Sequence, residues 1–288
     1  MEGIEAIKKS TKKIMLTSKK ARSFQKFQYF GQRDIDLDKV EKIKGVILTN
    51  TFPGAPYIAI VTCDGRKFLA DGNHTTQAMA ELQTTTTIPA MLDIWKCRNQ
   101  IELAQLYTCF NTQKTEKTAT QLSRPFLKIM SNVSDNENFS TLERIMKPAL
   151  SGLSYIDSLN KVDRANAIPE HYDDLLFSAK LCATDPLLKK GSVSGAMQLL
   201  LRHGESKEMV KKFFNSVKKP GAHGDPAGAC KLLLTSVNGR LGGSKERKDL
   251  ISQVMICFDY WKTGKKLTTE KSISKAIKKT ATNSSKAV

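Results

Sequence analysis

The residues of this chain best suited to chemistry stand together in the run Asp71-Gly72-Asn73-His74-Thr75. A carboxylate and an imidazole are common general acid–base groups, and a carboxylate is also a magnesium ligand. Glycine lets a ligand approach the backbone closely, and the first N–H groups of a helix favour anions. The run therefore predicts a polar site in which Asp71 and His74 are the candidate catalytic residues and Asp71 is a candidate metal ligand.

The elements around this run must place it at the end of a hairpin. Residues 56–62 have strand composition, Asp64-Gly65 is a two-residue hairpin signal, and residues 67–70 form the return strand. Apolar residues at helical spacing predict helices over 37–47 and 99–110, and residues 88–95 are typical of another strand. The polar run is thus a turn that leads from a strand directly into a helix.

This order of elements resembles the N-terminal domain of the ParB/sulfiredoxin superfamily, over residues 25–125. Many members carry Asp-Gly-Gln-His-Arg at the turn, where this chain has Asp-Gly-Asn-His-Thr. Arg33 resembles the arginine before the family's first helix, and Phe110-Asn111-Thr112 resembles a Phe-Asn element of phage and plasmid relatives. The resemblance implies an α/β (α+β) fold for this part and a phage, plasmid or other mobile element as its source.

The resemblance also implies a nucleotide or phosphate pocket at the turn, formed by Arg33, Gly72, Asn73, Thr75, Thr76, Asn111 and Lys114. Two positions depart from the family. Thr75 replaces the arginine that grips phosphate oxygens in nucleotide-binding relatives, so Arg33, Lys114 or Lys117 would have to supply that charge. Asn73 stands where sulfiredoxins place their reactive cysteine, which excludes sulfinic acid reduction.

Each of these residues also has a purely structural interpretation. Asp71 is suited to cap the following helix by accepting backbone N–H bonds. Thr75 and Thr76 would then be ordinary first-turn residues. Arg33 would pair with Asp34 or Asp36, and residues 111–117 would be a solvated connection between helices.

The positive charge of the chain is concentrated at its ends. The net charge is +18, of which residues 1–26 hold +6 and residues 205–288 hold +11. Basic ends beside a nearly neutral middle favour contact with nucleic-acid phosphates, although solubility alone would also explain them. Phosphate contacts carry no sequence information.

Recurrent basic pairs are the candidate nucleic-acid-binding residues: Lys211, Lys212, Lys218, Lys219, Lys265, Lys266, Lys278 and Lys279. Each pair alone is typical of a solvated face. Tyr260 and Trp261 lie close to two of the pairs, so they are placed either to stack on bases or to pack a helix.

Composition excludes several classes of protein. The apolar runs are shorter than the ~20 residues that a membrane span needs, and the scattered cysteines form no Cys-x-x-Cys pair. We therefore expect a cytoplasmic protein, in a bacterial host if a phage or plasmid encodes it, without zinc, haem or flavin. Mg²⁺ and a nucleoside triphosphate are the cofactors that the resemblance favours. It also suggests a homodimer, although no heptad seam supports one.

We expect four parts along the chain. These are a basic N-terminal arm or short amphipathic helix (1–24), the ParB-like domain (25–125), a helical domain (126–262) and a basic C-terminal tail (263–288). Residues 131–138 are polar and predict a linker. Helical segments are predicted over 141–146, ending near Pro148, and over 169–182, 192–202, 207–217, 226–237 and 245–262.

The leading functional hypothesis is a ParB-like, DNA-associated protein that acts in DNA modification, regulation or partition. Its basic ends would hold nucleic acid, with DNA favoured over RNA, and the turn would bind a nucleotide or phosphate. Whether the chain is an enzyme stays open. One alternative is a metal-dependent nuclease, or a hydrolase or phosphotransferase acting on nucleoside triphosphates, with Asp71 and His74 at its site. Another is a non-catalytic scaffold that binds proteins.

Overall fold

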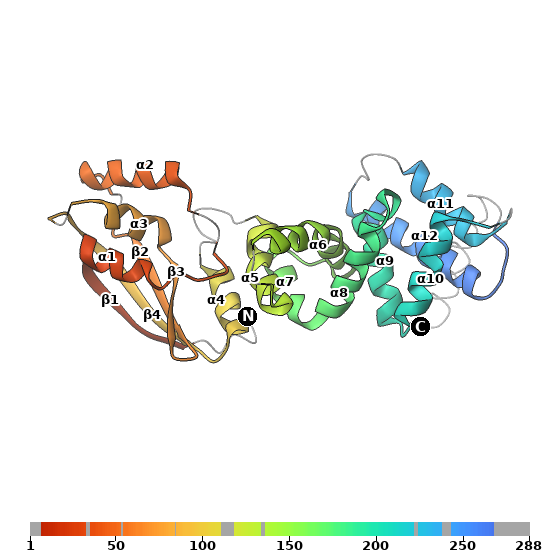
Figure 1. The fold of residues 1–288 in the computed structure, drawn as a ribbon, viewed down its shortest axis with the longest axis horizontal. Helices are drawn as coiled ribbons and strands as arrows, with labels where there is room; N and C mark the ends of the chain where they lie inside the picture. The colour runs from red at the N-terminus through yellow and green to blue at the C-terminus, as the bar shows by residue number, and fades with distance from the viewer. Residues whose placement is uncertain are drawn as a thin grey trace. The chain divides into compact units, whose positions relative to one another are not determined.

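The computed structural model of the chain describes residues 7–32, 35–52, 54–83, 85–110, 118–133, 136–221, 224–237 and 243–267. The chain divides into two compact units, Met1–Ser134 and Asp135–Val288, which we name the sheet unit and the helical unit (Figure 1). The predicted sequence of an α/β part followed by a mostly helical part is confirmed.

The described strands of the sheet unit form one mixed sheet in the order β1-β4-β2-β3. The strands are β1 (Ile7–Thr17), β2 (Tyr57–Cys63), β3 (Arg66–Asp71) and β4 (Thr87–Cys97). β1 pairs with β4 and β2 pairs with β3 in antiparallel fashion, whereas β2 and β4 are parallel. Asp64 and Gly65 have φ of 48° and 73°, and these positive values are those of the tight hairpin turn that the sequence predicts.

The N-terminal segment differs from the expected basic arm or amphipathic helix. Ile7–Thr17 is an edge strand of the sheet, and Ser18–Gln25 forms helix α1. Leu16 and Ala21 are fully buried in the same core. Lysines on an edge strand are common because they discourage pairing with other chains. The basic residues of this segment are therefore compatible with a strand.

Helices cover the sheet on both faces (Figure 1). α1, α2 (Leu37–Leu48) and α3 (Asn73–Glu81) share a core with one face, which includes Ile58, Leu69 and Ile88. α4 (Gln100–Cys109) packs on the other face, against Val61 and Cys97. α5 (Ala119–Ser131) completes the unit. The predicted helices over 37–47 and 99–110 and the predicted strands match this order closely.

The helical unit contains a core of buried aliphatic and aromatic side chains, with Phe213, Phe214 and Phe258 near its centre. Its elements are α6 (Asn136–Asp157), α7 (Lys161–Asn166), α8 (Ile168–Ala183), the 3₁₀ turn η1 (Pro186–Leu188), α9 (Gly191–Arg202), α10 (Lys207–Lys218), α11 (Pro226–Ser236) and α12 (Ser244–Lys262). No helix in the described part of the chain is long and apolar enough to cross a membrane.

The structure departs from two predictions for the start of this unit. Helix α6 does not end near Pro148 but continues to Asp157. Its buried residues on both sides of the proline, Met146 and Leu153, stabilise the helix despite the missing N–H. The predicted polar linker over 131–138 is shorter than expected, since α5 ends at Ser131 and α6 begins at Asn136.

Candidate functional site

The polar turn lies where the sequence places it, between β3 and α3. Asp71 ends the strand, and Gly72 has φ of +87° and is the N-cap of the helix. A Cβ atom on this glycine would lie 2.8 Å from the carbonyl oxygen of Tyr57 and 3.1 Å from Cγ1 of Ile58. Only glycine therefore fits this position without strain, because both the backbone conformation and the close approach exclude a side chain.

Asp71 accepts a backbone N–H at the start of α3. Its Oδ1 accepts the N–H of Gly72 at 2.7 Å, and Gly72, the N-cap residue, makes no side-chain cap bond of its own. This contact agrees with the capping interpretation of Asp71 for the N–H of the N-cap residue. The helix α3 begins beside the half-buried carboxylate of Asp71 and next to the backbone of β2.

Asn73 and Thr76 are held by two glutamines from the region of α1. The Gln25 Nε2 donates to Asn73 Oδ1 at 3.2 Å and to Thr76 Oγ1 at 2.5 Å, and the Gln28 Nε2 donates to Asn73 Oδ1 at 3.1 Å. The Thr76 side chain is fully buried. These polar groups are thus used inside the protein, where they fasten the turn to the N-terminal segment.

His74 joins two helix starts. Its Nε2 accepts the backbone N–H of Asp36 at 3.3 Å, and Asp36 is the N-cap of α2, where its Oδ1 accepts the Lys39 N–H at 3.1 Å. The imidazole is half-buried. This contact gives His74 a structural role that sequence reasoning did not predict. Thr75, beside it, is half-buried and makes no hydrogen bond through its hydroxyl among the described residues.

Several predicted site residues lie outside the described residues: Arg33, Asn111, Lys114, Lys278 and Lys279. Their proposed roles stay predictions. Within the described ranges, no three His, Cys, Asp or Glu side chains are grouped in a way that would hold a metal ion.

A buried carboxylate near the turn was missed by sequence reasoning. Asp93 on β4 is fully buried, and the hydroxyl of Tyr57 donates to its Oδ2. Ala59 on β2 is the lateral neighbour of both Asp93 on β4 and Asp71 on β3. The two carboxylates therefore flank one alanine across the sheet. A single acid within the apolar strand 88–95 is the sequence signal that could have indicated this position.

Cys63 and Cys97 are structural residues of the sheet. They lie side by side in the β2–β4 register, and both are buried. Burial raises the pKa of each of these thiols, and their mutual contact raises that of Cys63 further. Both side chains therefore stay protonated at neutral pH, and a thiol is a poor nucleophile.

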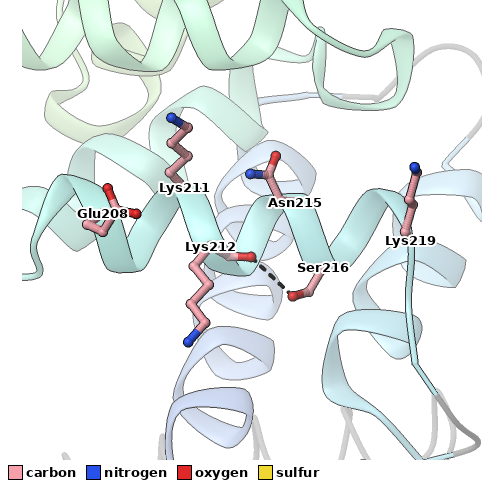
Figure 2. A pocket seen from close by; sticks show the side chains of 6 residues that line it. All are labelled: Glu208, Lys211, Lys212, Asn215, Ser216 and Lys219. Atoms are coloured by element: carbon pink, nitrogen blue, oxygen red, sulfur yellow. Dashed lines mark hydrogen bonds between the residues drawn. The ribbon is translucent and has the colours of Figure 1, made fainter.

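A basic surface lies on α10 in the helical unit (Figure 2). We name it the α10 stripe. It consists of Glu208, Lys211, Lys212, Asn215, Ser216 and Lys219, which line a shallow hollow. Lys211, Lys212 and Lys219 are exposed and form no ion pair within the described part of the chain. The opposite side of the same helix is buried in the core through Val210, Phe213, Phe214 and Val217.

The other predicted basic residues behave differently. The Lys218 ammonium donates to Thr184 Oγ1 at 2.7 Å and to Asn215 Oδ1 at 3.0 Å, so it is directed toward the protein. Lys265 and Lys266 are exposed just after α12. Trp261 packs on Phe213 with ring centroids 5.5 Å apart, which favours the packing interpretation over base stacking for this residue.

Comparison with known proteins gives no relative for either unit. No family model matches the chain, and no similar protein was found among curated proteins or solved structures.

Proposed function

We propose that this chain binds nucleic acid, with DNA as the expected partner, through lysines of the helical unit. The observation that carries the proposal is the α10 stripe, where Lys211 and Lys212 on α10 and Lys219, the residue that follows it, line one hollow, are exposed and form no ion pair with described residues. Each lysine that neutralises a phosphate releases counterions, which makes binding favourable and strongly dependent on salt.

The geometry of the stripe suits a nucleic-acid backbone. Lys211 and Lys219 are eight residues apart, which is about 12 Å along a helix. The helix cannot rotate about its axis, because Phe213, Phe214 and Val217 anchor its other side in the core. The backbone that carries these lysines is therefore fixed, which limits the ordering cost of binding to that of the side chains.

The polar groups of the stripe favour binding without sequence preference. Ser216 donates its hydroxyl to the carbonyl oxygen of Lys212 at 3.1 Å (Figure 2). Asn215 Oδ1 accepts from the Lys218 ammonium. These contacts engage the Ser216 hydroxyl proton and the Asn215 carbonyl oxygen, two of the groups that could read base edges. Lysines that contact phosphates position a protein on DNA but do not select a sequence.

For the sheet unit, we propose a ParB-like domain whose turn binds a phosphate or nucleotide. The support is the order of α2, β2, β3, α3, β4 and α4 and the Asp-Gly-Asn-His-Thr turn. Since Asn73, His74 and Thr76 make contacts inside the protein, the proposal relies on the backbone N–H groups at the start of α3, where the N-cap residue Gly72 has no side chain to cap them. Enzymatic use of Asp71 and His74 with Mg²⁺ stays the alternative.

The test of nucleic-acid binding is a salt titration with the full chain. Fluorescence anisotropy would measure affinity for duplex DNA, single-stranded DNA and RNA at several salt concentrations. We expect the triple variant Lys211→Gln, Lys212→Gln, Lys219→Gln to bind more weakly. Its salt slope should fall by about 0.9 for each phosphate that the variant no longer neutralises.

The matched control removes the same charge elsewhere. Lys42, Lys147 and Lys180 are exposed on α2, α6 and α8 and are not part of the α10 stripe, and the triple Gln variant of these residues has the same net charge. It should bind nearly as well as the wild-type chain. Equal losses of affinity in both triple variants would mean that net charge, and not the α10 stripe, drives binding.

The test of the turn restores the missing family residue. We expect Thr75→Arg to raise the affinity for ATP, CTP or GTP, measured with and without Mg²⁺ by calorimetry, because a guanidinium grips phosphate oxygens in pairs. Thr75→Gln has a long side chain without the charge and serves as the control. Absence of nucleotide binding in all three proteins would contradict the turn as a nucleotide site.

A further inference from the structure

One end of a sheet face is open and apolar. Tyr57 is 40% exposed and Met15 is 50% exposed, Pro89 is exposed, and Met91 is half-buried. The strand registers make them neighbours, since Met15 pairs with Pro89 and Tyr57 pairs with Met91. We name these four residues the Tyr57 patch. α4 packs against the same face at its other end, near Cys63 and Cys97.

The ring of Tyr57 is held in place by a hydrogen bond through its hydroxyl. Its hydroxyl donates to the fully buried carboxylate of Asp93, two residues along β4 from Met91. A tyrosine fixed in this way loses little conformational freedom when a ligand covers its ring. The two methionines beside it are polarizable and adapt to different ligand shapes.

A lysine lies at the edge of the patch. Lys13 on β1 is exposed and pairs with Met91, which in turn pairs with Tyr57. The other lysines of β1 are not part of this edge, since Lys12 pairs with Leu92 of the opposite face and Lys8 pairs with Trp95 further along the strand. Neighbouring strands are about 4.8 Å apart, which places the backbone of Lys13 about 10 Å from that of Tyr57. The strand thus brings positive charge beside an exposed aromatic ring.

We propose that the Tyr57 patch binds single-stranded nucleic acid, with an unpaired base stacked on Tyr57 and a neighbouring phosphate held by Lys13. Charge complementarity supports this partner, because aromatic side chains next to lysines are the usual platform for single strands. A stable protein interface needs about 20–30 residues on each side, whereas the Tyr57 patch has four. This inference rests on the proposed nucleic-acid binding and adds a second contact surface in the sheet unit.

The experiment uses the full chain and single-stranded DNA that contains 5-iodouracil. Photocrosslinking followed by mass spectrometry should place crosslinks on the β2 or β4 peptides that contain Tyr57 or Met91. Anisotropy with an unmodified single strand should show about tenfold weaker binding for Tyr57→Ala, the usual effect of losing one stacked base. Tyr57→Phe keeps the ring and should retain more affinity, and duplex affinity should stay unchanged in both.

The controls separate this inference from the proposed function. Leu232→Ala removes an apolar side chain that is 69% exposed on α11, and it should change nothing. Lys13→Gln tests the patch without touching the Tyr57–Asp93 contact and should weaken single-strand binding. Crosslinking on the wild-type chain keeps the test valid if Tyr57→Ala does not fold.

Three outcomes would overturn the inference. The first is that Tyr57→Ala and Lys13→Gln bind single strands as tightly as the wild-type chain. The second is that the crosslinks lie outside β1, β2 and β4. The third is that Tyr57→Ala changes only self-association, measured by sedimentation, which would make the patch a contact between copies. If the α10 triple variant loses binding in any of these cases, the proposed function stands and only the inference fails. No binding by the wild-type chain would reject both.

Discussion

His74 Nε2 accepts the backbone N–H of Asp36 at 3.3 Å, and this contact joins the first turns of α3 and α2. The bond requires that Nε2 carries no proton. A histidine that the family resemblance places in a phosphate or catalytic site therefore also holds two helices together. The two roles predict different effects of substitution, since loss of a structural histidine lowers stability and loss of a catalytic one lowers turnover.

We expect His74→Ala to lower the free energy of unfolding by about 0.5–1.5 kcal/mol, the typical net value of one hydrogen bond. Urea denaturation would measure it, and His203→Ala, an exposed histidine after α9, is the control. Affinity for duplex DNA should not change, because the α10 stripe belongs to the other unit. Turnover of a nucleotide or nucleic acid that disappears in His74→Ala would support the enzyme alternative instead.

Gly72→Ala should destabilise the chain more than a glycine substitution in the hairpin turn of the same sheet. A positive φ costs an alanine roughly 1–2 kcal/mol, and the new Cβ would also lie 2.8 Å from the Tyr57 carbonyl oxygen. Gly65→Ala is the matched control, because its φ is +73° and nothing lies within 4 Å of its Cβ position. The difference between the two variants in urea denaturation measures the close approach, and equal destabilisation would contradict it.

Local signals predicted much of the sheet unit. Asp64-Gly65 and Gly72 occupy positions with positive φ, where turn chemistry acts within a few residues and does not depend on distant contacts. In the helical unit, Pro226 is the first residue of α11, as its fixed φ favours. These residues could be assigned from sequence because their constraints are local.

Features that depend on distant residues were not predictable in the same way. β1 was missed because a strand with four lysines becomes stable only when β4 pairs with it and Leu16 is buried. Pro148 lies inside α6 because packing of the helix compensates for one missing hydrogen bond. Asp93 became a candidate only when the sheet register placed it beside Ala59 and Tyr57.

The glutamine contacts of the turn give a third prediction. We expect Thr76→Val to lower the free energy of unfolding by about 0.5–1.5 kcal/mol, because the hydrogen bond from the Gln25 amide to Thr76 Oγ1 is lost while the amide keeps its bond to Asn73. Thr75→Val is the control, since its hydroxyl makes no hydrogen bond among the described residues. Hydrogen exchange at the start of α3 should increase in Thr76→Val alone. Similar stability of both variants would show that the bond from Gln25 contributes little.

The ion pair between Lys44 on α2 and Glu81 on α3 should make stability depend on pH. Hydrogen bonds from Lys44 and Gln77 lower the pKa of Glu81 below its ordinary value. A lowered pKa in the folded state means that the stabilisation is complete above the ordinary glutamate pKa of about 4.3 and disappears as the pH falls through the folded value. Glu81→Gln should therefore be less stable than wild type at pH 7, and the difference should shrink as the pH approaches about 3. Urea denaturation across this range measures the effect, with exposed Asp173→Asn on α8 as the control. A difference that stays constant with pH would show that the charge of Glu81 does not contribute.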